Sequence, residues 1–234
     1  MKQIRLGCCK GIEHVLSPSS VTDSLQTLEI LRLWYLDNLR KLFRKERAAS
    51  ARVPANTFSC LKKIDIQVCP NIKKLLPPGL LLQLRNLEKI FVCNCNQLEE
   101  IIGEASDEFE EEEKEEEGMD TTKITLPKLR VIQLWHLPGL KTVCSGSKVI
   151  VCDSLKWIKI SSCPKLKRLP LSLPLLSNGQ LSPPPSLKEI SAREEWWESL
   201  KWDSPDTKNV LQPFFRKFPK HGICGQWSVP SRSC

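Results

Sequence analysis

The chain has 234 residues, which suits a single domain, and it carries a formal net charge of +8 at pH 7. It contains no run of about 18 apolar residues, so the sequence predicts no membrane-spanning helix. No apolar stretch near Met1 is long enough for a signal peptide. The 11 cysteines are an odd number. We therefore expect a cytoplasmic protein with reduced thiols rather than a secreted, disulfide-bonded protein.

An apolar pattern recurs along the chain, in part at residues 4–15 and in full from residues 28, 61, 87, 129 and 155. In the stretch LKKIDIQVCPNIKKL, apolar residues occupy positions 61, 64, 66, 69, 72 and 75. This spacing fits a short strand followed by a returning loop, both with apolar side chains on one side. A single such unit cannot bury its own apolar face, so the copies must stack on one another.

The repeated pattern has the form of a leucine-rich repeat, and a decayed copy of it ends near Ala192. The fold class is therefore α/β: a leucine-rich repeat solenoid with a curved parallel β-sheet on the concave face and irregular loops or short helices on the convex face. We assign residues 1–192 to this solenoid. The sequence predicts its strands at residues 4–6, 31–33, 64–66, 90–92, 132–134, 158–160 and 190–192.

Four cysteines, Cys9, Cys69, Cys95 and Cys163, share one position of the repeat. A small thiol packs well at a buried position, so burial accounts for them. Cys93 and Cys95 then point to opposite sides of the chain. No second Cys/His pair has a suitable spacing, so we expect neither a zinc site nor a cofactor.

Charge is unevenly distributed along the solenoid. Residues 104–120 hold eleven acidic residues and one lysine. Like charges repel one another, so we expect this insertion to be a disordered, solvated loop; the alternative is a contact with basic surface. Basic pairs occupy one shared loop position and predict a basic stripe, without the aromatic platform or motif of a nucleic-acid site. These pairs are Arg40-Lys41, Lys73-Lys74 and Lys167-Arg168.

Side chains that alternate with the buried ones form three columns across the predicted concave face, where leucine-rich repeats usually bind partners. Aromatic and arginine side chains dominate interface energetics, and we expect exposed aromatic rings on this face. The alternative for Trp34 and Trp135 is that they fold over the sheet edge or support a loop. The candidate protein-binding residues are Trp34, Arg32, Phe91, Trp135, Gln133, Trp157 and Lys159.

Tryptophans are concentrated near the C-terminal end, in REEWWESLKWDSPDTKNVLQPFFRKF at residues 193–218. Trp196, Trp197 and Trp202 follow the final recognisable repeat, and we expect them to cap the open end of the core. Residues 219–234 carry no repeat pattern and are expected to be a flexible tail.

The spacing E-x-W-W-x-x-L-x-W, followed by Pro-Phe-Phe, is similar to the end of plant resistance proteins of the coiled-coil, nucleotide-binding, leucine-rich-repeat class. The repeat LKxIxIxxCPxLKxLP, as at residues 155–170, resembles theirs as well, and the resemblance covers residues 1–218. It implies the C-terminal part of a longer receptor, which binds a pathogen effector or a modified host protein and contributes to autoinhibition. The implied partners are that protein ligand and the nucleotide-binding module, with no membrane or nucleic acid.

The sequence contains no G-x-x-x-x-G-K-[ST] motif, so the resemblance carries over no nucleotide site. A catalytic role needs a converging nucleophile, base and orienting group, and His14, His136 and His221 suggest no such set. We therefore expect no enzymatic activity. The alternative functions are a leucine-rich-repeat protein-binding scaffold and a substrate receptor of a ubiquitin ligase, which needs an adaptor-binding helical motif.

Overall fold

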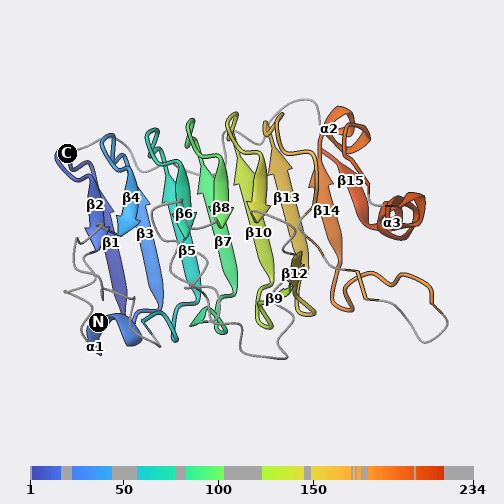
Figure 1. Ribbon diagram of the computed structural model, residues 1–234, viewed down its shortest axis with the longest axis horizontal. Coiled ribbons are helices and arrows are strands. Elements are labelled where there is room, and N and C mark those ends of the chain that lie inside the picture. The colour runs from blue at the N-terminus through green and yellow to red at the C-terminus, as the bar shows by residue number, and fades with distance from the viewer. Residues whose placement is uncertain are drawn as a thin grey trace, which may run out of the picture.

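A parallel sheet of eight strands runs through the molecule from one end to the other in chain order (Figure 1). The computed structural model describes residues 2–16, 23–43, 57–76, 83–102, 123–144, 149–169, 171, 173–174, 179–202 and 204–218. Seven of the strands of this main sheet are those that the repeat pattern predicts, and the α/β solenoid is confirmed. The strands are β1 (Gln3–Gly7), β3 (Ile30–Trp34), β5 (Lys63–Gln67), β7 (Lys89–Cys93), β10 (Val131–Trp135), β13 (Trp157–Ser161), β14 (Glu189–Ala192) and β15 (Phe215–Lys217).

The strands of the main sheet pair in register, so equivalent residues of successive repeats are neighbours. Ile64 of β5, for example, lies beside Leu31 and Ile90. These inward residues are buried and belong to one continuous hydrophobic cluster that runs the length of the sheet. Each fully buried Leu or Ile contributes roughly 1.5–3 kcal/mol of transfer free energy, before entropy is counted.

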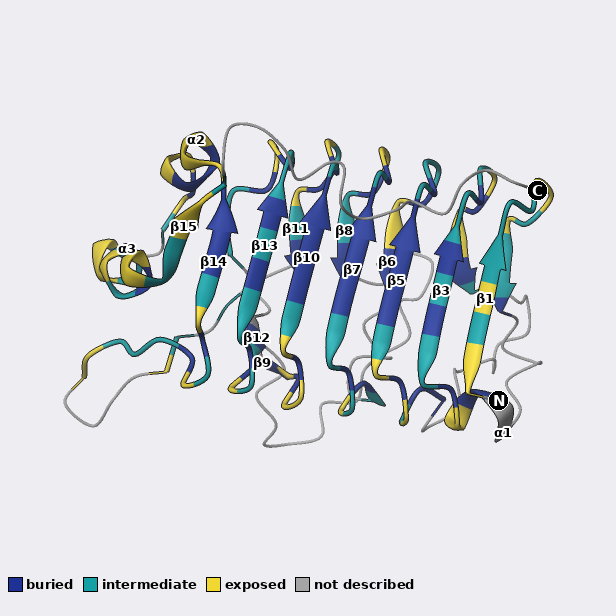
Figure 2. Cartoon of the chain, turned by 180° about the vertical axis from the view of Figure 1, so that it is seen from behind, coloured by how far each residue is buried: buried dark blue, intermediate teal, exposed yellow. Residues whose placement is uncertain are grey.

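Short parallel strands line the other side of the core (Figures 1 and 2). The expectation was irregular loops or short helices, and the observed chain is more regular. The reason is that apolar residues such as Leu42, Leu75, Ile101 and Val143 recur at a fixed distance after each main strand, so successive backbones run side by side. The pairs and triplet are β2 (His14–Leu16) with β4 (Lys41–Phe43); β6 (Lys74–Leu76), β8 (Glu100–Ile102) and β11 (Thr142–Cys144); and β9 (Lys123–Thr125) with β12 (Val149–Val151).

One residue after each of the first six main strands has a positive φ, although none of them is glycine. These residues are Cys8, Tyr35, Val68, Asn94, His136 and Ser162. Val68, with φ of 53°, is a costly case because its Cβ is branched. Its amide donates to the carbonyl of Cys93 on the next strand at 2.9 Å, and the turn directs Cys69 into the core. The equivalent bond to the next strand forms at Cys8, Tyr35, Asn94 and His136, so the stacked neighbours hold this conformation at these turns.

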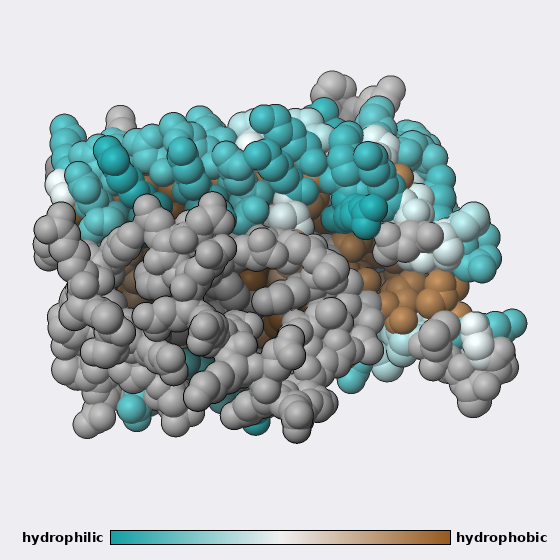
Figure 3. Space-filling model, in the orientation of Figure 1, coloured by the Kyte–Doolittle hydropathy of each residue, from teal (hydrophilic) through white to brown (hydrophobic). Residues whose placement is uncertain are grey.

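Acidic residues interrupt the predicted basic stripe. Glu99, just before β8, and Glu100, its first residue, lie between the basic positions at the starts of β6 and β11. They form ion pairs with Lys141 (Nζ–Oε2, 2.6 Å) and Lys74 (3.3 Å). Hydrophilic residues form a band along the edge that carries the turns after the main strands (Figure 3). The stripe is therefore a mixed-charge ridge. The acidic insertion (104–120) and the tail (219–234) lie outside the described residues.

The two ends of the core differ. At the β1 end, Ile4, Leu6, Cys9, Ile12 and Val15 are only partly buried, whereas their counterparts in the central repeats are fully buried. The described helices are α1 (Asp23–Gln26), α2 (Glu194–Glu198), α3 (Pro205–Leu211) and the 3₁₀ helix η4 (Gln212–Phe214), the last three near the β15 end. None of the helices in the described ranges has the length and apolar composition that a membrane crossing requires.

At the β15 end, an aromatic stack covers the sheet. Trp197 of α2 is 0% exposed and stacks on Phe215 of β15, with centroids 4.6 Å apart. Trp202 packs edge-on against Trp197 at 4.9 Å. The indole N–H of Trp196 donates to the carbonyl of Leu166 at 2.9 Å. Strand β15 pairs in parallel with β14, so the sheet continues beyond the last repeat; the repeat pattern does not predict this strand.

We predict that Trp197→Ala lowers the free energy of unfolding by about 3–5 kcal/mol, because the substitution removes a fully buried indole and leaves a cavity. Urea unfolding measures the change, and Trp34→Ala, which truncates a half-exposed indole, serves as the matched control. A loss no larger than that of the control would contradict a capping role.

A chain that ends at Glu195 should aggregate, and one that ends at Pro219 should remain monomeric.

Candidate functional site

The side chains of the main sheet that point away from the core form an open face, which is the concave face of the sequence prediction. Because the strands are in register, these side chains align in columns that cross the sheet. The central column contains Arg5, Arg32, Asp65, Phe91, Gln133, Lys159 and Ser191. Along β5, β7, β10 and β14 the outward residues near the end of each strand are buried, and the first residue of each strand is more exposed (Figure 2). All seven candidate binding residues lie on the open face.

Phe91 and Trp135 are not exposed, contrary to the expectation from the sequence. Their exposed fractions are 8% and 7%, and with Cys93 they form a small cluster separate from the main core. The two rings meet edge to face, with centroids 5.6 Å apart. Strands β7 and β10 are neighbours, so each ring covers surface that the other would leave open. Gln133, which lies beside Phe91 in the register and two residues before Trp135 on β10, is also buried.

Trp34 lies against the adjacent strand β1. A Cβ added to Gly7 would come within 2.0 Å of the Trp34 ring, so glycine is required there for the indole to take this position. The ring is half-buried. This placement matches the alternative in which Trp34 folds over the sheet, while part of the ring stays accessible.

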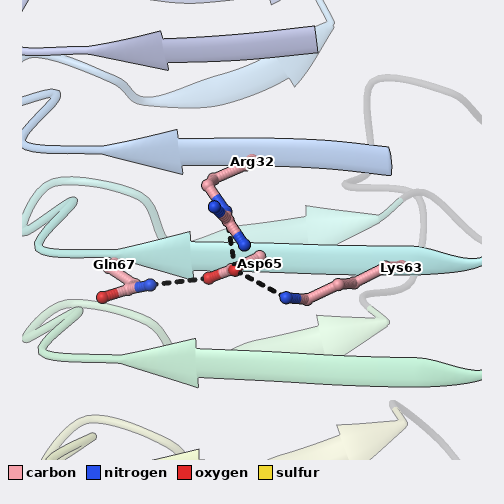
Figure 4. A network of polar contacts seen from close by, with 4 residues as sticks. All are labelled: Arg32, Lys63, Asp65 and Gln67. Carbon is pink, nitrogen blue, oxygen red and sulfur yellow. Dashed lines mark hydrogen bonds and ion pairs between the residues drawn. The ribbon is translucent and has the colours of Figure 1, made fainter. Parts of the chain in front are cut away.

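An ion network occupies the N-terminal half of the open face (Figure 4). Asp65 is only 2% exposed. Its carboxylate accepts hydrogen bonds from Arg32 (Nε–Oδ2, 2.9 Å) and Gln67 (Nε2–Oδ1, 2.7 Å), and Lys63 Nζ lies 3.1 Å from Oδ2. Of these four residues only Arg32 is among the binding residues predicted from the sequence. Alternation places Asp65 on this face, but only the register brings Arg32 beside it.

The C-terminal half of the open face carries Trp157, which is half-exposed. Its ring lies 5.9 Å from Lys156 Nζ and 5.8 Å from Lys188 Nζ. Lys159, two residues along the same strand, is half-buried in the central column. The pKa of Lys89, on the same face, is lowered chiefly because the side chain is partly buried. The positive charge of Lys63 lowers it further. The open face therefore combines an accessible indole with closely spaced cations.

Sequence comparisons assign the chain to a protein family. The sequence profile described as "Plant disease resistance protein RPS2-like, leucine-rich repeats" matches residues 44–174. The chain belongs to this family of plant disease resistance proteins. Relatives in Arabidopsis thaliana include Disease resistance protein At4g27190, 30% identical over 84% of this chain and 18% of its own length. Disease resistance protein RPS5 is 28% identical over 82% of this chain and 20% of its own length.

The RPS2-like chain thus spans about a fifth of the length of the relatives it matches. The matched region includes strands β5 to β13, which contain Asp65, Phe91 and Trp157. The family assignment accounts for the repeat core. Outward side chains can differ without altering such a core, so the chemistry of the open face follows from its own residues.

We predict that Asp65→Ala lowers the free energy of unfolding by roughly 1–3 kcal/mol, because it removes a buried acceptor that two cations and one amide share. Chemical denaturation measures the loss. Glu29→Ala, which breaks an exposed pair with Lys62 on the neighbouring row, should produce no measurable change. Equal stability of the two variants would show that the network contributes nothing to the fold.

Proposed function

We propose that this chain is a non-enzymatic recognition module of plant innate immunity that acts in the cytoplasm. Its open face binds a protein partner, either a pathogen effector or a host protein that an effector modifies. The same repeat region contributes to autoinhibition by contacting the nucleotide-binding module of its receptor. The observation that carries the proposal is the half-exposed Trp157 on a sheet whose backbone is held in register on both sides.

Physical properties of the open face support protein binding. Its side chains project from strands rather than loops, so a partner meets a surface whose backbone is already ordered, and little conformational entropy is lost on association. Indole and guanidinium groups are enriched among residues that dominate interface energetics. Trp34, Arg32 and Trp157 are such groups and retain exposed area. Phe91, Gln133 and Trp135 are buried, and they instead shape the part of the face that lies between Trp34 and Trp157.

Site-specific photo-crosslinking tests the proposal. A photoreactive amino acid replaces Trp34 or Trp157 on the open face, and Lys128 or Lys201 on turns away from it, in the chain expressed in plant cells. We expect the same protein to be cross-linked from both open-face positions and from neither turn position. Cross-linking to the nucleotide-binding module would assign the autoinhibitory contact to this face.

A matched variant separates binding from folding. Trp157→Ala should weaken association with the cross-linked partner by at least about tenfold, because truncating a central aromatic residue typically costs 2 kcal/mol or more of affinity. Its melting temperature should stay close to that of the unmodified chain. Cross-links that arise only from positions 128 and 201 would reject the open face as the binding surface.

A further inference from the structure

We propose that the cations around Trp157 form a binding site for an acidic segment of a partner protein, with an apolar side chain of that segment seated on the indole. We call the side chains of Arg130, Lys156, Trp157, Lys159 and Lys188 the Trp157 subsite. The proposal rests on the proposed function, because it specifies the chemistry of the partner at the open face.

The backbone places three of the cations in a row. Arg130, Lys156 and Lys188 each precede a main strand, and their backbones are joined from Lys156 N to Arg130 O and from Lys188 N to Lys156 O, both at 2.9 Å. Adjacent strands are about 4.8 Å apart, so the backbones that carry these three cations lie within roughly 10 Å of one another. Like charges at this spacing repel one another, and an anionic ligand removes that repulsion.

The same row has a different charge pattern in the N-terminal half of the sheet. There its residues are Lys2, Glu29, Lys62 and Glu88, linked by the same backbone hydrogen bonds. Cations and anions alternate, and Glu29 Oε2 lies 2.8 Å from Lys62 Nζ. Asp65 likewise engages the cations Arg32 and Lys63. Arg32, Lys62 and Lys63 in the N-terminal half are thus paired with acidic side chains.

Few anionic groups face the Trp157 subsite. The register places Gln133 and Ser191, both neutral and buried, on either side of Lys159. Glu189 neighbours Trp157 and forms a hydrogen bond with the Ser191 hydroxyl. Within the described residues, no ion pair joins any of the four subsite cations to an acid. These four cations outnumber the two neighbouring carboxylates, which belong to Glu189 and to Glu88, whose backbone carbonyl accepts from Arg130 N at 2.8 Å.

The indole gives the Trp157 subsite an apolar centre. Lys156 and Lys188 hold their ammonium groups 5.9 Å and 5.8 Å from the ring centre, within the range of a cation–π attraction. Their positions favour carboxylates at the rim and an apolar side chain over the ring. Nucleic acid is less well matched, because single-stranded chains use several aromatic platforms in succession and this subsite offers one.

Peptide titration tests the proposal directly. The probe is a fluorescent glutamate-rich peptide with one central phenylalanine, titrated with the full chain and followed by anisotropy. Glutamine-rich and lysine-rich counterparts and single-stranded DNA of similar length serve as comparison ligands. We expect the acidic peptide to bind at least tenfold more tightly than each of them. Equal or tighter binding of DNA would overturn the proposal.

Matched variants distinguish a defined subsite from diffuse charge. The triple substitution Lys156→Ser, Lys159→Ser and Lys188→Ser should weaken binding of the acidic peptide at least tenfold. The equal charge change at Lys10, Lys128 and Lys201, all exposed and outside the subsite, should weaken it less than about twofold. Equal losses in the two triple variants would overturn the proposal.

Two further variants address folding and the apolar centre. Lys159→Arg keeps the charge and should retain binding. Trp157→Ala should weaken binding of the phenylalanine-containing peptide more than it weakens binding of the same peptide with serine at its centre. Equal weakening of both peptides would show that the indole seats no apolar side chain. The melting temperature of each variant shows that the chain is folded during the titration.

A deletion identifies the source of the acidic ligand. If removal of residues 104–120 leaves peptide affinity unchanged, the subsite is open to a partner, as proposed. If the deletion strengthens binding tenfold or more, the chain's own acidic segment is the ligand and the partner assignment is overturned.

Failure of peptide binding with persistent cross-links from positions 34 and 157 would reject only the acidic chemistry, whereas loss of the cross-links would reject the proposed function itself.

Discussion

The structure depends on the stacking of inward Leu and Ile side chains from one parallel strand to the next. No single repeat can bury these side chains, so each strand is stable only between neighbours that are in the same register. The register then determines which side chains become neighbours on the opposite, open face of the sheet. Arg32 reaches Asp65, and Trp34 covers Gly7, because the buried residues next to them are aligned.

Much of this architecture follows from the sequence because burial leaves a periodic pattern. The spacing at 61, 64 and 66 predicts strand β5, and equivalent spacings predict six more strands. Lateral packing leaves no such pattern, so the burial of Phe91 and Trp135 against each other could not be foreseen. The positive φ of Val68 is equally hidden, since the residue type argues against it and only the neighbouring repeats impose it. Strand β15 lacks the repeat spacing altogether.

The open face is divided by its electrostatics. In the N-terminal half, Asp65 pairs with Arg32 and Lys63, and Glu29 pairs with Lys62. In the C-terminal half, the charge around Trp157 is mainly positive and flanks an accessible ring. A repeat core leaves such outward residues free to differ, so one scaffold can carry different surfaces. The binding specificity proposed for this face therefore depends on residues that the core does not constrain.

The most direct test of this account is the unfolding free energy of Ile158→Asp compared with that of Lys159→Ser. The two positions are adjacent on β13, and only Ile158 points into the stacked core. We expect Ile158→Asp to cost several kcal/mol or abolish folding, because it buries a carboxylate among apolar side chains without a partner. Lys159→Ser should unfold at nearly the same denaturant concentration as the unmodified chain. Equal stability of the two variants would contradict the claim that in-register apolar stacking holds the sheet and its open face together.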